Sequence, residues 1–162
     1  MIDLAHIHPM LVHFPLALLP VALGAQALVI ARGNSLFGRS CAAQTGFWLT
    51  MLAAIGALAA AVFGDIALDR AVASGIPLTS LETHEELGQL TAVLLSLLAA
   101  AEVWLYRKSS GSTTINRGTW IAGIIVLAFL LTTAWFGGQL VYKLGVNVTP
   151  PAPSSNQTIE RP

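Results

Sequence analysis

The sequence predicts an all-α integral membrane protein, a four-helix bundle with both chain ends on the outer side of the membrane. The chain has 162 residues, of which 55% are hydrophobic and 10% are charged, whereas soluble proteins carry about 25% charged residues. It also contains four apolar runs that approach or exceed the roughly 20 residues that a helix needs to cross a bilayer. The net charge is zero and no basic patch is present, which argues against nucleic-acid binding.

The predicted helices lie in one domain, residues 1–146, and a polar tail follows. They are expected at about 9–31, 44–68, 80–106 and 118–142. Pro9 suits the first helical position, because its missing N–H would be unpaired there, whereas Pro15 and Pro20 predict a kink. Thr79 begins a capping-box pattern, with a competing one at Thr83. Residues 147–162 are rich in Pro, Ser, Thr and Asn, which is typical of a disordered tail.

Charged loop residues predict the orientation of the bundle. The loops after the first and third helices contain five basic residues: Arg32, Arg39, Arg107, Lys108 and Arg117. Short cytoplasmic loops are enriched in Lys and Arg, so both termini are expected in the periplasm of a bacterium, with the bundle in its inner membrane. The opposite, outer end is mainly acidic, and such a surface would attract a basic soluble partner such as an electron carrier.

Helical spacing predicts which faces point inward. Polar side chains are costly in lipid, so the face of the third helix that contains polar groups should look into the bundle: His84, Gly88, Thr91, Leu95 and Glu102. On the second helix, a stripe of small residues allows close packing: Ala53, Gly56, Ala57, Ala60 and Gly64. On the first helix, the face expected to point inward holds a histidine above small residues: His13, Ala17, Pro20 and Gly24.

His13 and His84 are candidate axial ligands of haem b. Each is expected as the fifth residue of its helix, and the two helices run in the same direction, so the rings would lie at similar depth beneath the outer face. Two imidazoles that face each other across a bundle can hold haem b without thioether links. Ala17 and Gly88, about one turn below the two rings, would leave room for the flat macrocycle.

Two other interpretations of the histidines stay open. A Zn or Fe ion would bind His13 and His84, with His8, Glu85 or Glu86 as further ligands, because these metals accept imidazole and carboxylate together. Alternatively, the histidines only cap helices and form hydrogen bonds at the membrane interface, without a cofactor. His8 precedes the expected start of the first helix and is interpreted as a solvated or capping group.

Other candidate groups give weaker signals. Glu102 would relay a proton or pair with a nearby basic or hydroxyl group, and Asp65 and Asp69 would bind a cation or simply mark the end of a helix. The lone cysteine, Cys41, excludes an intramolecular disulfide, a CxxCH haem site and a cysteine-bound iron–sulfur cluster. No hydrolase or kinase motif is present, so the protein is at most a redox subunit rather than another kind of enzyme.

The segment from His8 to Pro15, HPMLVHFP, resembles the signature of a family of predicted bacterial inner-membrane proteins, a domain of unknown function with an HPxxVHFP motif. The resemblance continues at four places: Gly64-Asp65, His84, GGQLVY at 137–142, and Gly145-Val146. It implies four membrane helices, and the association of some members with Rieske-type or cytochrome-like redox components favours a haem. The family often has a histidine where this chain has Leu144, which leaves His13 and His84 as the expected axial pair.

Two function classes therefore remain. The first is a b-type haem protein or electron-transfer subunit with ligands His13 and His84. The second is a non-catalytic scaffold or accessory subunit, embedded in the lipid bilayer, whose small-residue stripes serve assembly with other membrane subunits. A visible spectrum of the purified protein, together with metal analysis, distinguishes the two classes and the bare-ion alternative.

Overall fold

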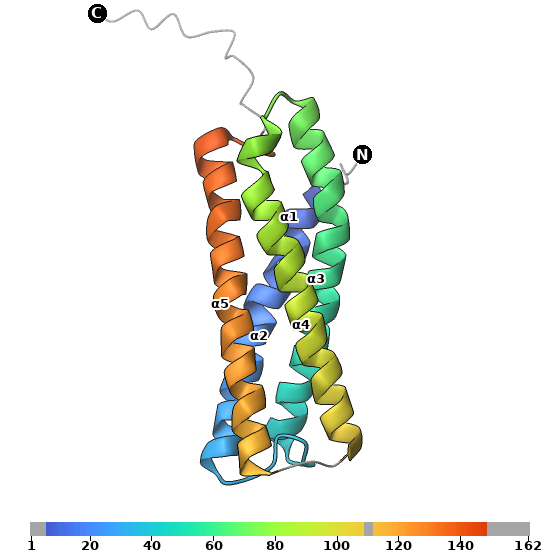
Figure 1. Cartoon of the computed structure of the whole chain (residues 1–162), viewed down its shortest axis with the longest axis vertical. Helices are drawn as coiled ribbons and strands as arrows, with labels where there is room; N and C mark the ends of the chain where they lie inside the picture. Colours follow the sequence, from blue (N-terminus) through green and yellow to red (C-terminus); the bar gives the residue numbers. More distant parts are fainter. Residues whose placement is uncertain (1–5, 109–111, 149–162) are drawn as a thin grey trace, which may run out of the picture.

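The computed structural model describes residues 6–108 and 112–148 (Figure 1). Its elements are α1 (Ile7–Leu11), α2 (His13–Ala31), α3 (Cys41–Ala73), the short 3-10 helix η2 (Leu78–Ser80), α4 (Glu82–Lys108) and α5 (Thr113–Leu144). No strand occurs in these two stretches, so the predicted all-α class is confirmed. Of the expected polar tail, only residues 147 and 148 belong to the described part of the chain.

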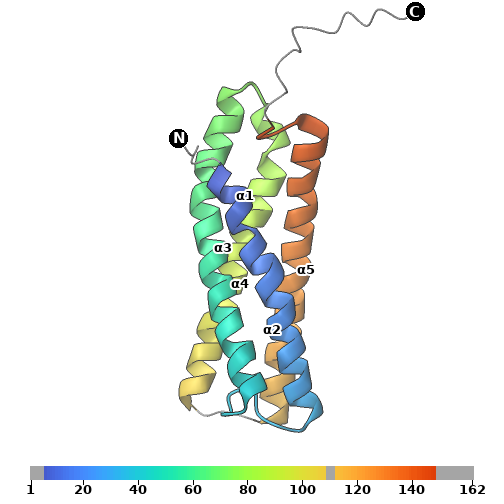
Figure 2. The same cartoon turned by 180° about the vertical axis from the view of Figure 1, so that it is seen from behind.

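The helices form an up-and-down bundle in which α1 and α2 together make the first long unit. This unit lies between α3 and α5, diagonally across the bundle from α4 (Figures 1 and 2). The start of α1 and the end of α5 lie at the same end of the bundle, which we call the terminal end. Four helices are long and apolar enough to cross a membrane: Ile7–Ala31, Cys41–Ala73, Glu82–Lys108 and Thr113–Leu144.

Capping side chains explain why α3 and α5 begin earlier than expected. The hydroxyl oxygen of Ser40 accepts a hydrogen bond from the N–H of Ala43, and that of Ser112 accepts one from Ile115. Each serine therefore satisfies one of the N–H groups that a helix start leaves unpaired. At the other end of α5, Gly145 has a φ of 64°, a left-handed conformation that glycine adopts without strain and that ends the helix.

Two expected helix starts are wrong. α4 begins at Glu82, not after a Thr79 cap, because residues 78–80 form a 3-10 turn and Leu81, which is buried, precedes the helix. The first helix begins at Ile7, not at Pro9, and it breaks at Val12. Pro15 has no N–H to donate to the carbonyl of Leu11, which explains a break one turn before it.

The inward faces expected on α3 and α4 are confirmed, and the one expected on the first helix is wrong. Ala53, Gly56, Ala57 and Ala60 are buried on α3, as are Thr91, Leu95 and Glu102 on α4. In contrast, the side expected to point inward on the first helix is exposed: His13, Ala17, Pro20 and Gly24. The buried side of α2 contains Pro15, Leu19, Ala22, Leu23, Gln26 and Val29 instead.

Candidate functional site

His8 and His84 meet near the terminal end of the bundle. Their ring centroids are 6.1 Å apart and their planes are nearly perpendicular, at 83°. His8 belongs to α1 and His84 is the third residue of α4, so the pair spans the diagonal of the bundle. Both side chains are half-buried. The structure therefore brings two imidazoles together, but one of them is His8, which the sequence predicted to be a solvated or capping group. That interpretation is wrong, because His8 is half-buried and contacts α3.

Each imidazole is oriented by a backbone carbonyl from a neighbouring helix. Nδ1 of His8 lies 2.8 Å from the carbonyl oxygen of Ala60 on α3, and Nδ1 of His84 lies 3.1 Å from that of Thr133 on α5. A carbonyl can only accept, so Nδ1 carries the proton and donates in both contacts. Nε2 is then left as the unprotonated nitrogen of each neutral ring, which is how ligating histidines are arranged around metals.

Two glycines make room for the rings. A Cβ atom on Gly137 would lie 2.8 Å from Cε1 of His84, closer than real Cβ contacts occur, and the three atoms nearest to that position all belong to this imidazole. A Cβ on Gly64 would lie 3.3 Å from Nδ1 and 3.4 Å from Cε1 of His8. The edge of His8 that carries Nδ1 therefore faces α3, and its Nε2 lies on the side away from Gly64.

A cavity of about 630 Å³ surrounds the two rings. Pockets for small molecules and cofactors commonly measure about 300–1,000 Å³. Its walls come from α1 to α5 and contain many small or aliphatic residues, among them Ala57, Ala60, Gly88, Ala92 and Leu130. The cavity is therefore large enough for a cofactor and mostly apolar, with the two imidazoles among its polar groups.

The other expected site residues occupy different places. His13 borders the cavity, but its ring is exposed and Nδ1 lies 2.5 Å from the carbonyl oxygen of Pro9 on its own helical segment. His8, and not His13, is therefore the neighbour of His84. Ala17 is exposed and lies away from the cavity, whereas Gly88 lines it. Glu85 also lines the cavity and accepts a hydrogen bond from Gln89 at 3.2 Å, while Glu86 is exposed.

A pair of threonines lies beneath His84 and connects α4 to α5. The hydroxyl oxygens of Thr91 and Thr133 are 2.9 Å apart, so one hydroxyl donates to the other. The second hydroxyl keeps its single proton for a nearby backbone carbonyl, that of Leu87 or, for Thr133, also that of Phe129. Both side chains are buried. Because Thr133 also supplies the carbonyl that holds His84, this hydroxyl pair fixes the height of α5 relative to the imidazole.

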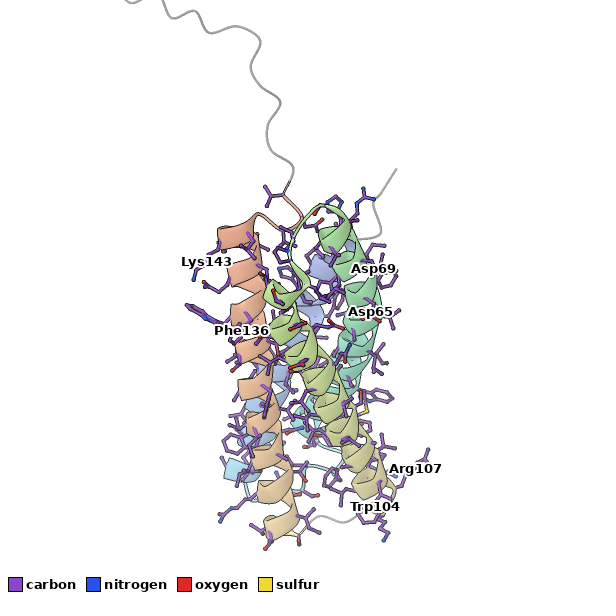
Figure 3. All side chains as sticks on the ribbon, turned by 45° about the horizontal axis from the view of Figure 1, so that its top comes forward. Asp65, Asp69, Trp104, Arg107, Phe136 and Lys143 are labelled. Carbon is purple, nitrogen blue, oxygen red and sulfur yellow. The ribbon has the colours of Figure 1, made fainter. Side chains whose placement is uncertain are left out.

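Charged side chains divide between the two ends of the bundle. Asp65 and Asp69 lie near the terminal end and Arg107 lies near the opposite end (Figure 3). The exposed carboxylates of Glu82 and Glu86 also belong to the terminal end of α4. Asp65 and Asp69 are both exposed. In the part of the chain that the structure describes, no three His, Cys, Asp or Glu side chains come close enough to hold a metal ion.

The position of Gln26 is the signal that would have identified His8. Gln26 is the one amide in the apolar run of the first helix and, like other polar groups in lipid, it should point inward. Steps of three and four residues lead from it through Ala22, Leu19 and Pro15 to Val12 and His8. That line is the buried face of α2 in the structure, so the amide, and not His13, marks the inward side.

Comparison with known protein families gives a match that agrees with this membrane architecture. The model of a family described as predicted membrane protein (DUF2231) matches residues 5–150. No curated protein and no solved structure matches the chain. The match covers the four helices long enough to cross a membrane together with His8 and His84, so the chain belongs to the family of predicted membrane proteins DUF2231.

Proposed function

We propose that the cavity binds haem b between His8 and His84, and that the protein is a b-type haem-binding membrane protein or electron-transfer subunit. The observation that carries the proposal is the His8–His84 pair, in which each Nδ1 is bonded to a carbonyl oxygen and each Nε2 is left free to coordinate. Haem b held by two imidazoles supplies a one-electron redox centre. This assignment replaces His13 of the sequence-based hypothesis by His8.

The separation of the rings fits one metal between them. Two metal–imidazole bonds of about 2.0 Å each, together with the distance from each nitrogen to its ring centre, place the centroids roughly 6 Å apart. The observed centroid distance is 6.1 Å. Perpendicular ring planes are compatible with this arrangement, because each imidazole can turn about its own bond to the metal.

The absence of a third protein ligand in the described stretches favours haem over a bare ion. A structural zinc ion takes four protein ligands and a catalytic one takes three, and no cluster of three candidate ligands exists there. In haem, the porphyrin supplies four nitrogen ligands to the iron, so the protein would supply only two. The alternative Zn or Fe site would be built from His13 and His84, with His8, Glu85 or Glu86 as further ligands. It is disfavoured because the ring of His13 lies against Pro9 and Glu86 is exposed.

A visible spectrum tests the proposal directly. The protein is expressed with haem supply, purified in mild detergent and analysed for haem and for metals. We expect a b-type spectrum that is lost in His8→Ala and in His84→Ala but retained in His13→Ala, which is the matched control at the rim of the cavity. Circular dichroism checks that each variant is folded. A colourless wild-type protein refutes haem binding; bound metal then supports the ion site, and no metal supports an accessory subunit.

The charge asymmetry further supports an orientation with the terminal end outside. Basic residues gather at the opposite end, including Arg32 and Arg107, and the cytoplasmic ends of membrane proteins are enriched in Lys and Arg. We therefore assign the protein to a bacterial inner membrane with both termini in the periplasm. The lone Cys41 is exposed at the basic end. In intact cells, Cys41 should not react with a membrane-impermeant thiol reagent. In the variant that combines Cys41→Ser with Ser74→Cys, the new cysteine at the terminal end should be labelled.

The acidic terminal end suggests the kind of redox partner. Exposed carboxylates of Asp65, Asp69, Glu82 and Glu86 surround the end where the cavity lies. Such a surface would steer a basic soluble electron carrier, and attraction between exposed charges weakens as salt rises. Binding of a basic carrier protein to the purified membrane protein should therefore fall steeply with ionic strength. Binding that is unchanged in high salt would contradict this assignment.

A further inference from the structure

A buried polar cluster lies in the half of the bundle opposite the histidines. It consists of Gln26 on α2, Thr50 on α3 and Glu102 on α4, whose side chains are 3%, 0% and 2% exposed. Nε2 of Gln26 donates to Oε1 of Glu102 at 2.8 Å, and it lies 3.5 Å from Oγ1 of Thr50. None of the three residues lines the histidine cavity. The cluster is therefore a second and separate polar contact across the diagonal of the bundle.

Two oxygen atoms of this cluster have no hydrogen-bond partner in the described structure: Oε1 of Gln26 and Oε2 of Glu102. Both atoms are acceptors if Glu102 is ionised, and neither can satisfy the other. An ionised carboxylate in apolar surroundings also needs a cation close by. Among the described residues, the structure records no ion pair with Glu102, and its polar neighbours are the Gln26 amide and the Thr50 hydroxyl.

One proton removes all of these difficulties. We propose that Glu102 holds a proton in the folded protein and that this proton closes a two-point carboxylic acid–amide pair with Gln26. The amide N–H donates to one carboxyl oxygen, and the carboxyl O–H donates back to the amide oxygen. The two orphaned atoms are the two that this second hydrogen bond joins. The site is thus a proton-binding site inside the membrane-spanning part of the chain.

The same conclusion follows if the oxygen and nitrogen of the Gln26 amide are exchanged, an assignment that rests on the hydrogen-bond network. The atoms that are 2.8 Å apart would then be two oxygens, Oε1 of Gln26 and Oε1 of Glu102, and only a proton between them makes that distance favourable. Thr50 supports the orientation in which Nε2 of Gln26 is the donor, because the Thr50 hydroxyl donates to the carbonyl oxygen of Gly46 at 3.0 Å and is left to accept from Gln26.

The position of the cluster determines where the proton exchanges. Between it and the histidines lies the apolar core, which includes Leu19, Ala53, Leu95 and Leu130. On the other side, α4 ends at Lys108, six residues or about 9 Å beyond Glu102. Tyr106 lies one turn beyond Glu102 and stacks on Phe47 with ring centroids 4.9 Å apart. Exchange with the aqueous phase at the basic end is therefore the shorter route.

Infrared spectroscopy of the purified full-length protein in detergent tests the proposal. At about pH 6, two units above the ordinary carboxyl values of about 4, carboxyl groups in contact with water are deprotonated, so a C=O band of a protonated carboxyl group reports a buried one. We expect this band in the wild type, its loss in Glu102→Gln and its retention in Glu85→Gln, the control on the same helix. In Gln26→Leu the band should move to higher frequency, because the carboxyl group loses its amide partner.

Three outcomes would overturn the proposal. The first is the absence of the band in the wild-type protein, a measurement that needs no variant and therefore does not depend on whether Glu102→Gln folds. The second is a band that persists in folded Glu102→Gln. The third is a band whose frequency is the same in Gln26→Leu as in the wild type, which would exclude the pairing with Gln26. Haem content enters none of these measurements, so this test is independent of the proposed function.

Discussion

The imidazole rings of His8 and His84 lie nearly perpendicular to one another with their centroids 6.1 Å apart. Each ring is hydrogen-bonded to a helix that carries neither of the two histidines. The first ring is bonded to α3 through Ala60 and the second to α5 through Thr133. The pair therefore depends on all four membrane spans at once. A rotation of any one of them would change the distance or the tautomer on which the proposed haem site relies.

The contact between Gly137 and His84 gives the first prediction. In Gly137→Ala the new Cβ would lie 2.8 Å from Cε1 of His84, and overpacking of this kind costs about 1–3 kcal/mol. Over most of this range the cost exceeds the gain of about 1 kcal/mol from replacing glycine in a helix. We expect a lower free energy of unfolding, measured by denaturant titration in detergent, and a displaced or lost haem spectrum.

Gly138→Ala is the matched control for this change. It lies on the same helix, and a Cβ there meets nothing within 4 Å. It should leave the protein as stable as the wild type or slightly more stable. Equal effects of the two alanine substitutions would show that Gly137 does not make room for the imidazole.

The hydroxyl pair of Thr91 and Thr133 gives the second prediction. In a double-mutant cycle with Thr91→Val and Thr133→Val, the coupling energy should be about 0.6 kcal/mol, the average for hydrogen bonds between membrane helices. Thr132→Val serves as the control partner, because Thr132 is exposed and bonds to Ala128 on its own helix. A cycle of Thr91→Val with Thr132→Val should show no coupling. Coupling of the same size in both cycles would contradict the observed pairing.

The close approach of α2 to α3 at Gly56 gives the third prediction. A Cβ on Gly56 would lie 2.9 Å from Cβ of Phe14 and 3.3 Å from Cδ of Pro15. These atoms are next to the backbone and cannot swing away, so Gly56→Ala should destabilise the protein by about 1–3 kcal/mol. Thermal unfolding of Gly24→Ala, whose Cβ has nothing within 4 Å, provides the reference. Identical unfolding of the two variants would argue against tight packing at Gly56.

The close contact between Gly46 and the side chain of Gln26 gives the fourth prediction. A Cβ on Gly46 would lie 2.8 Å from Cγ of Gln26, so Gly46→Ala should push the amide away from Glu102. We expect the infrared band of the protonated carboxyl group to shift toward its frequency in Gln26→Leu. In Gly118→Ala, where a Cβ has open space, the band should stay where it is in the wild type. No shift in Gly46→Ala would mean that the amide is not held by this contact.

Much of the fold could be predicted because the hydropathy and the length of each apolar run can be read from neighbouring residues in the sequence. Four apolar runs of sufficient length require four helices, since a chain in lipid must satisfy its backbone hydrogen bonds within each segment. The inward faces of α3 and α4 were also predictable. On both helices small or polar residues are confined to one side, and membrane packing places such residues at helix contacts. Composition and spacing therefore determined the class, the number of spans and two of the buried faces.

The first helix shows where this reasoning fails. Apart from Gln26 its run is apolar on every side, and proline, glycine and histidine occur on the face that the structure leaves exposed. Histidine at position 13 therefore appeared to mark the interior, although its ring lies against Pro9. The packing of α2 against α3, where Phe14 and Pro15 meet Gly56, decided the rotation of this helix and turned His8 inward.

The partners of the polar side chains were decided by the tertiary structure alone. Gly137 has no local feature that links it to His84, and Gln26 has none that links it to Glu102, because each pair comes from helices distant in sequence. The sequence by itself determined that this chain forms four helices long and apolar enough to cross a membrane and that its polar groups must be satisfied inside the bundle. Which of them meet depends on helix rotation, and rotation is fixed by side-chain packing between helices rather than by the pattern within any one of them.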